Sequence, residues 1–169
     1  MTLEDQTDLQ EQVRAVLDDN RYMVLGTADA EGRPRVTPVY FTHHDYRALY
    51  WVSEPTSQHS SNVSSRPEVE AVVFDSTREP KRAEAVYLTG RAHEVDPAVL
   101  EEECRRAFAA VGKGARPFAP DELSGTERLR LYRLDVGAHG VHIRGSDPVR
   151  GRGIDHRGAV TMPGRPSSD

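Results

Sequence analysis

The sequence predicts a mainly β fold in which six or seven antiparallel strands close, or nearly close, into a barrel with a few peripheral helices. Strand-like runs rich in Val, Tyr, Phe and Thr follow one another through short turns, and such connections imply antiparallel pairing. Only two segments show a clear helical period. Closure of the sheet would remove the exposed edges that an open sheet leaves.

The first part of the chain is predicted to hold one helix and three strands in a meander. Leu9, Val13 and Leu17 fall on one face of a helix over residues 9–17. The period then changes, and acidic residues with a glycine at 29–32 give a hairpin signal. Strands are expected at 22–28, 35–42 and 48–53, with a turn at 43–47 between the last two.

The remaining elements alternate in the same way. The polar segment 55–66 predicts one or two helical turns that end at Pro67. Leu100, Cys104 and Phe108 share one face of a second clear helix over 97–111, so the cysteine is expected to be buried and inert. Further strands are expected at 69–75, 83–95, 128–136 and 141–143.

The chain of 169 residues has the length of one domain, which we assign to residues 1–145. After Gly145 the sequence consists mainly of Gly, Pro, Arg, Ser and Asp, with few apolar side chains. Such a segment buries too little surface to offset the entropy of ordering it. Residues 146–169 are therefore predicted to form a disordered tail.

Composition excludes several classes of function. The net charge of −5 argues against nucleic acid as the main partner, because binding to phosphates needs a basic surface. No apolar run approaches the ~18 residues of a membrane span, and the acidic N-terminus lacks the apolar core of a signal peptide. With a single cysteine, this predicts a cytoplasmic protein without membrane contact.

The histidine pattern does not predict a metal site. His139 and His142 lie three positions apart on a strand and therefore point to opposite faces. His43 and His44 are adjacent in a turn, and neither CxxC nor HExxH is present. We therefore expect no dedicated metal centre.

The segment 51–63 carries the clearest chemical pattern. A strand enters a helix start through several hydroxyl residues, among them Ser53 and Ser57. Helix starts present free N–H groups and a partial positive charge, which bind phosphates. His59 and Asn62 fall on one face of this helix. A capped, solvated helix explains the same residues, because serine is a common N-cap, so both interpretations stay open.

The order of three segments resembles the pyridoxamine 5′-phosphate oxidase-like family of flavin-binding split barrels. These segments are YMVLGTADAEGRPRVTPVYF, LYWVSEPTSQHSSNVSSRPEVEAVVFDS and AVYLTGRAHEV, and the resemblance runs from about Leu9 to Val136. It implies an antiparallel split barrel of the FMN-binding type. It also implies a homodimer with two flavin sites in the clefts between the subunits. Members bind FMN, in some branches the deazaflavin F420, and in a few cases haem.

The resemblance also implies cofactor-binding positions. The family's second strand contacts the flavin, and its third strand with the following helix start binds the phosphate. In this sequence these positions are Val36, Thr37, Pro38 and Val39, and Ser53, Ser57, Gln58, His59 and Asn62. In the pyridoxamine phosphate oxidases proper, several such positions are Arg or Lys; here they are Thr37, Thr42, Gln58 and His59. Phosphate binding is therefore expected either to be weaker or to rely on the helix dipole and hydroxyl donors, with His59 charged when the phosphate is bound. Arg66 or Arg35 could compensate for the missing charge.

These features favour an FMN-dependent oxidoreductase that acts on an unidentified small molecule. The protein supplies orientation and electrostatics, so no catalytic acid or base is named. The pyridoxal phosphate recognition segment of the true oxidases is not apparent in residues 132–136, which argues against vitamin B6 oxidation. Alternatives are an F420-binding oxidoreductase, a non-catalytic flavin- or haem-binding protein, and a degenerate member that persists as a dimer scaffold.

The residues themselves also indicate a homodimer. Ala71 and Val73 alternate with Val72 and Phe74, so both faces of the predicted strand 69–75 are apolar. A strand that is apolar on both faces needs cover on both. A twofold interface is the commonest way to provide it.

Overall fold

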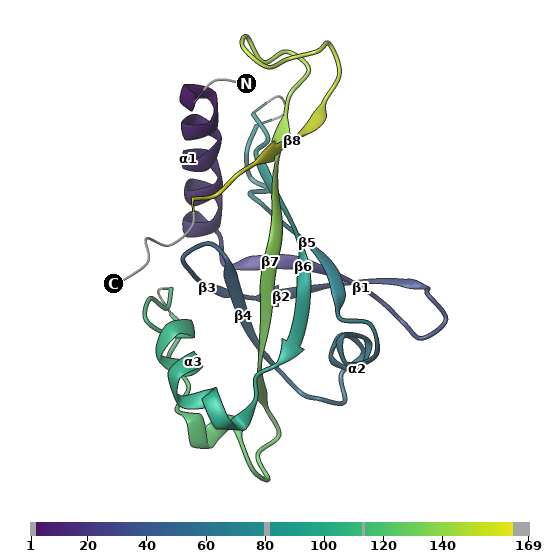
Figure 1. Cartoon of the computed structure of the whole chain (residues 1–169), viewed down its shortest axis with the longest axis vertical. Coiled ribbons are helices and arrows are strands. Elements are labelled where there is room, and N and C mark those ends of the chain that lie inside the picture. The colour runs from purple at the N-terminus through teal and green to yellow at the C-terminus, as the bar shows by residue number, and fades with distance from the viewer. Residues whose placement is uncertain (1–2, 80–81, 113, 164–169) are drawn as a thin grey trace.

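The computed structural model describes residues 3–79, 82–112 and 114–163 (Figure 1). In this part of the chain, eight strands form one curled antiparallel sheet, with three α-helices around it. The strands are β1 (Tyr22–Ala28), β2 (Pro34–Tyr40), β3 (Thr42–His44), β4 (Ala48–Ser53), β5 (Glu68–Phe74), β6 (Ala85–Glu94), β7 (Arg130–Ile143) and β8 (His156–Val160). The helices are α1 (Leu3–Asp19), α2 (Gln58–Ser65) and α3 (Leu100–Ala107), with short 3₁₀ helices at Pro97–Val99 and Pro120–Leu123.

The strand order shows how the sheet curls into a barrel that stays split. The order is β2-β1-β5-β6-β7-β4-β3, with β8 added to β7. The two end strands, β2 and β3, follow one another in the chain and are separated only by Phe41. The sheet therefore bends until β2 lies near β4, although the described residues form no ladder between these two strands. This confirms the predicted mainly β split barrel.

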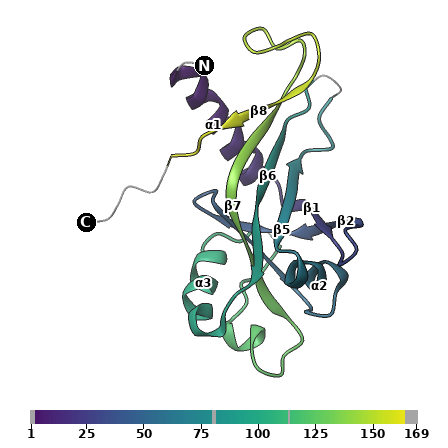
Figure 2. The same ribbon diagram turned by 45° about the vertical axis from the view of Figure 1, so that its right-hand side comes forward.

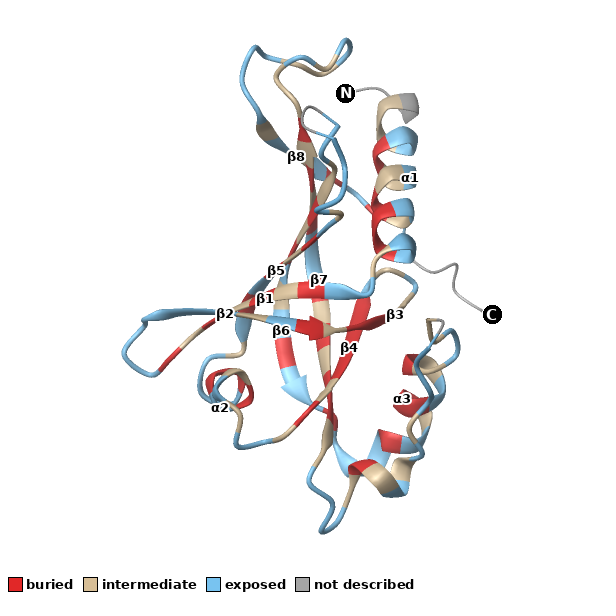
Figure 3. Ribbon diagram, turned by 180° about the vertical axis from the view of Figure 1, so that it is seen from behind, coloured by how far each residue is buried: buried red, intermediate tan, exposed pale blue. Residues whose placement is uncertain are grey.

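The barrel interior is filled by alternate side chains of the strands. Met23 and Leu25 of β1 are fully buried, as the inward-facing residues of a strand of period two should be. The Trp51 ring stacks on Tyr132 with centroids 5.6 Å apart. Helix α1 joins this core through Val13 and the other apolar residues of its predicted face. Figure 3 shows this red, buried stripe on the side of α1 that faces the sheet.

A second, smaller core lies outside the barrel, between α3 and strands β4 and β7. It contains Tyr50, Leu100, Cys104 and Leu131, and the cysteine is buried as predicted. Helices α2 and α3 lie on either side of β6 and β7 (Figures 1 and 2). Among the described helices, none combines the length and the apolar character that crossing a membrane requires.

The prediction of a disordered tail from residue 146 is wrong for residues 146–163. Strand β8 pairs with the end of β7, and Val160 and Met162 are only 6% and 5% exposed. The backbone N–H of Thr161 donates to Gln6 Oε1 at 3.0 Å, which ties the segment to α1. The prediction counted apolar side chains and neglected the main-chain hydrogen bonds that an added strand gains. Residues 164–169 lie outside the described residues.

Several predicted element boundaries also differ: α1 begins at Leu3 and α3 ends at Ala107, short of residue 111. Two further differences concern the strands. The strands expected at 128–136 and 141–143 form one continuous strand, β7, because its glycines stay extended between them. The strand expected at 35–42 is interrupted at Phe41, and the residues after it form the separate strand β3. This bend takes the chain from one end of the sheet to the other.

Candidate functional site

A cavity of about 520 Å³ lies where the barrel is split, between β2 and β4. The end of α3 and the loop after it form its outer wall. The lining residues are Thr37, Pro38, Val39, Tyr40, Thr42, Tyr50, Trp51, Val52, Ser53, His59, Phe108, Val111, Ala115, Arg116, Phe118 and Leu129. Five of the nine predicted cofactor-binding residues are in this lining: Thr37, Pro38, Val39, Ser53 and His59.

Most of the outer wall is apolar and aromatic. Phe108 and Phe118 pack with ring centroids 5.9 Å apart, and Leu129 lies in the same cluster. Across the cavity, β4 contributes Tyr50 and Val52. Sites for small molecules and cofactors typically combine such apolar surfaces with a few polar groups that fix orientation. The wall therefore suits a planar ring system, because aromatic side chains stack on flat ligands.

A cluster of hydroxyl groups and one imidazole forms the polar end of the cavity. Ser53 Oγ lies 2.8 Å from His59 Nε2 and 3.1 Å from Ser57 Oγ. Ser57 is the N-cap of α2, and its Oγ accepts a hydrogen bond from the backbone N–H of Ser60 at 3.4 Å. The chain places these side chains together because β4 ends at Ser53 and a turn closed by a Ser57 N–H to Glu54 carbonyl bond, 3.0 Å long, starts the helix.

The polar end carries no fixed positive charge in the part of the chain that the structure describes. Burial lowers the pKa of His59, so the ring is neutral at neutral pH in the free protein. Arg116 is the one arginine among the described lining residues, and both of its terminal nitrogens contact the Glu122 carboxylate, at 2.9 and 2.6 Å. This hydrogen-bonded pair lowers the pKa of Glu122 to about 2. The polar end of the site therefore consists of neutral donors and the start of α2.

Strand β2 brings a free main-chain edge to the cavity. Among the described residues it pairs with β1 alone, in the register Leu25 to Thr37 and Met23 to Val39. In an antiparallel pair, alternate residues direct their N–H and C=O groups away from the partner strand. These outward groups are available to a ligand or to another chain, and Pro38 contributes a carbonyl only.

Two side chains of the cavity wall carry buried polar atoms without a partner. Thr42 Oγ1 and Trp51 Nε1 make no hydrogen bond to any described residue. Such orphaned groups are uncommon in native interiors and usually bond to a water or a ligand.

The other four predicted residues lie outside the lining. Val36 is 74% exposed on β2, and Gln58 stands at the start of α2 beside the N-cap Ser57. Asn62 is only 2% exposed and turns toward β1, where its Nδ2 donates to Thr27 Oγ1 at 2.9 Å. Its Oδ1 accepts from Gln58 Nε2 at 2.9 Å. Asn62 thus fastens α2 to the barrel, and a direct contact with a cofactor stays a prediction for all nine residues.

No sequence pattern predicts the outer wall of the cavity. The helical period predicts Phe108 only as part of the apolar face of a helix, and no pattern marks Phe118 or Leu129 as a site residue. The unusually apolar end of that helix was the available signal. Its apolar face is longer than the small core beneath α3 requires, because Phe108 is only partly buried there.

Comparisons with known proteins show the family of the chain and several solved structures with a similar fold. The family model described as pyridoxamine 5′-phosphate oxidase matches residues 9–136. No curated protein matches the chain. The haem-binding protein of Mycobacterium smegmatis has a similar fold, with a TM-score of 0.64 and 17% identity, over 89% of this chain and 57% of that one.

Two further solved structures are similar over most of both chains. An FAD-binding protein of Mesorhizobium loti has a TM-score of 0.58 and 21% identity, over 83% of this chain and 94% of that one. PhzG of Burkholderia lata 383, in complex with tetrahydrophenazine-1-carboxylic acid, has a TM-score of 0.58 and 13% identity, over 93% and 92%. At these identities the likeness concerns the fold.

Proposed function

The chain belongs to the pyridoxamine 5′-phosphate oxidase family, and from this premise we propose that it is an FMN-dependent oxidoreductase acting on a small molecule. One observation carries the proposal. A single cavity joins an aromatic wall, a free strand edge and a group of neutral donors at a helix start. These three features match the three parts of flavin mononucleotide: the aromatic wall suits its ring, the strand edge suits its polar pyrimidine edge, and the donors suit its phosphate.

The residues present fit this group. The outward main-chain groups of β2 would bind the polar edge of the ring, and Phe108 and Phe118 would cover its faces and exclude water. Ser53, Ser57 and His59 would hold the phosphate with the free N–H groups of α2. The bound flavin would supply the hydride acceptor, and contacts to its pyrimidine edge tune its electronics. The orphaned hydroxyl of Thr42 offers a further donor in the cavity wall.

A second candidate is a protein that binds flavin or haem without turnover. No unpaired cation is found among the described residues that line the cavity, and this favours the binder, because a neutral site binds a phosphate dianion less strongly than a charged one. The structural similarity to a haem-binding protein also supports this second candidate. The same lack of cations disfavours F420, which has a longer anionic tail.

We also propose that the functional unit is a homodimer. The outer edge of β2 is unpaired in the described chain, and Val36 on this strand is 74% exposed. A free edge beside exposed apolar side chains is normally covered. Light scattering during gel filtration is expected to give twice the 18.8 kDa of the chain. The variant Val36→Glu is expected to shift this toward the monomer, and a monomeric parent protein would overturn the proposal.

The cofactor assignment is tested by titrating the flavin-free protein with FMN, riboflavin, F420 and haemin. We expect FMN to saturate at one per protomer, with quenched flavin fluorescence, and to bind more tightly than riboflavin. Reduction of bound FMN by a nicotinamide under anaerobic conditions, followed by reoxidation, would support the enzyme. Bound flavin that no nicotinamide reduces would favour the non-catalytic binder, and preference for F420 or haemin would replace FMN.

A further inference from the structure

The loop between β7 and β8 is braced by its own hydrogen bonds. The backbone N–H of Gly145 donates to Asp155 Oδ1 at 2.8 Å, and that of Gly153 donates to the Gly145 carbonyl at 3.0 Å. A Cβ atom at Gly145 would lie 2.6 Å from the backbone nitrogen of Ile154, so a larger residue would force the loop open. The loop therefore has a defined shape, which its glycine-rich sequence hides.

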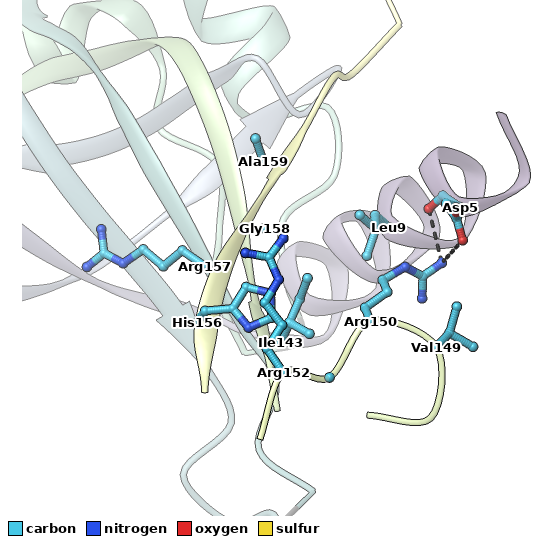
Figure 4. A pocket seen from close by; sticks show the side chains of 11 residues that line it. Asp5, Leu9, Ile143, Val149, Arg150, Arg152, His156, Arg157, Gly158 and Ala159 are labelled. Carbon is cyan, nitrogen blue, oxygen red and sulfur yellow. Dashed lines mark hydrogen bonds and ion pairs between the residues drawn. The ribbon is translucent and has the colours of Figure 1, made fainter. Parts of the chain in front are cut away.

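This loop encloses a second cavity, of about 530 Å³, against the start of α1 (Figure 4). Arg150 connects this loop to α1, because its Nη2 lies 3.3 Å from Asp5 Oδ1 and 3.1 Å from Asp8 Oδ2. The cavity is separate from the one at the split in the barrel, and its lining shares no residue with it. Most of the lining lies beyond residue 136, where the family match ends.

The floor of the second cavity is a small apolar patch formed by two nearly buried side chains, within a lining that is otherwise largely polar. Leu9 of α1 is 2% exposed and Ile143 at the end of β7 is 6% exposed, and both line it. Val149 stands at the rim and is 71% exposed. An apolar floor beneath an open rim fits a ligand with a small hydrocarbon body.

Three arginines line this cavity, and two of them are already neutralised. Arg150 is paired with aspartates of α1, as described above. Arg157 lies 3.2 Å from Glu70 Oε1 and covers the Tyr87 ring at 3.9 Å. In Figure 4 its side chain points away from the other lining residues.

The third arginine, Arg152, lacks such a partner. It lines the cavity and makes no hydrogen bond or ion pair with any residue that the structure describes. His156 lies in the same lining, and its Nδ1 is 3.4 Å from the Ile154 carbonyl, which leaves Nε2 for another contact. Among the described lining residues the only carboxylate is that of Asp5, which Arg150 contacts at 3.3 Å. The cavity therefore presents one uncommitted guanidinium above an apolar floor.

We propose that this second cavity binds a small organic monocarboxylate, with the carboxylate on Arg152 and the apolar body over Leu9 and Ile143. A guanidinium is planar and matches one carboxylate through two parallel hydrogen bonds. One uncommitted cation balances one negative charge, whereas a phosphate dianion would need a second. The His156 ring adds a donor beside the same group. The proposal is independent of the flavin site and goes beyond the proposed function.

The test uses the full-length protein and 4-fluorobenzoate, followed by fluorine NMR and calorimetry. We expect saturable binding at one site per protomer, with benzoate competing and benzamide competing at least tenfold less well. The variant Arg152→Gln is expected to weaken binding about tenfold or more, the range for a hydrogen bond to a charged group. Arg91→Gln is the matched control, because Arg91 is an exposed arginine on β6 that pairs with Glu68.

A second variant tests the placement of the ligand independently of Arg152. Val149→Glu sets a carboxylate at the exposed rim, where folding tolerates it, and repulsion is expected to weaken 4-fluorobenzoate binding several-fold. Unchanged affinity in both Arg152→Gln and Val149→Glu would overturn the proposal. So would equal competition by benzamide, which would indicate a purely apolar pocket, or tighter binding of inorganic phosphate than of benzoate.

Discussion

Replacement of His59 tests the phosphate end of the proposed flavin site. In the free protein, burial lowers the pKa of His59, and its ring contacts Ser53 Oγ at 2.8 Å. A bound phosphate favours the charged imidazolium and raises this pKa, so binding takes up a proton. The affinity for FMN should therefore be highest in mildly acidic solution. It should fall as the pH rises through the raised pKa of the complex.

The expected magnitude follows from two opposing contributions. A hydrogen bond to a charged group contributes about 1.5–3 kcal/mol. Protonating an imidazole whose pKa is lowered costs about 1.4 kcal/mol for each pKa unit. We therefore expect His59→Ala to weaken FMN binding by about 1.5 kcal/mol near pH 6, roughly tenfold in Kd. The loss should be smaller near pH 8, where the native ring is less often charged.

Flavin fluorescence titrations at about pH 6 and about pH 8 measure this directly. His59→Lys should bind FMN at least as tightly as the parent protein and with little pH dependence, because lysine stays charged. Riboflavin, which lacks the phosphate, should bind all three proteins equally. His93→Ala, an exposed histidine of β6, is the control. Equal FMN affinities in all variants at both pH values would refute the reasoning and leave His59 as a residue of a capped helix.

Three further predictions concern stability and reactivity. The Met162 side chain is only 5% exposed, so Met162→Ala should lower the free energy of unfolding, measured in urea, by about 2 kcal/mol or more. Val149→Ala, at an exposed side chain, should change it by less than about 0.5 kcal/mol. Equal effects of the two substitutions would mean that the segment after β8 does not pack. Burial raises the pKa of Glu103, but hydrogen bonds from Tyr50 and Arg133 outweigh it and hold the pKa below its ordinary value. The contribution of Glu103 to the free energy of unfolding should thus be complete above its unfolded-state pKa and be lost as the pH falls through its lowered pKa in the folded protein. Glu103→Gln should remove this pH dependence of stability and lower the free energy of unfolding by about 2 kcal/mol at neutral pH. Parallel profiles of stability against pH in both proteins would contradict this. Burial also raises the pKa of the Cys104 thiol, so its reaction with a disulfide reagent should be slow in the native protein and fast in urea, and a fast native reaction would show that α3 opens.

The strands of the barrel were predictable because alternation of apolar and polar residues records which face of a strand is buried. Met23 and Leu25 show this in β1, and the structure places the strand at the predicted residues. Strand β8 was not predictable in the same way, because Arg157, Gly158 and Ala159 carry no apolar alternation. Strand β8 is ordered by main-chain hydrogen bonds to β7 and by contacts with α1. These interactions depend on where β7 and α1 lie, and the residues of β8 alone do not reveal them.

The candidate site was predictable only in part, for a related reason. The spacing of His59 and Asn62 places both on one helix face, but it does not say what covers each end of that face. Asn62 meets Thr27 of β1 in the interior, whereas His59 meets Ser53 at the cavity. The outer wall with Phe118 comes from a loop distant in sequence, and no local pattern assigns such a loop to a strand.

The position of β4 in the sheet has a consequence for how the protein is made. Among the described strands, β4 pairs with the short strand β3 and with β7, so that Trp51 can pair with Tyr132 only when that distant part of the chain is present. Pairings between distant segments must close long loops before they gain any stability, and they form slowly. During synthesis, the aromatic strand β4 therefore leaves the ribosome long before its partner. A nascent chain that ends before β7 exposes one wall of the cavity between β2 and β4, and this interval is when we expect the protein to need a chaperone most.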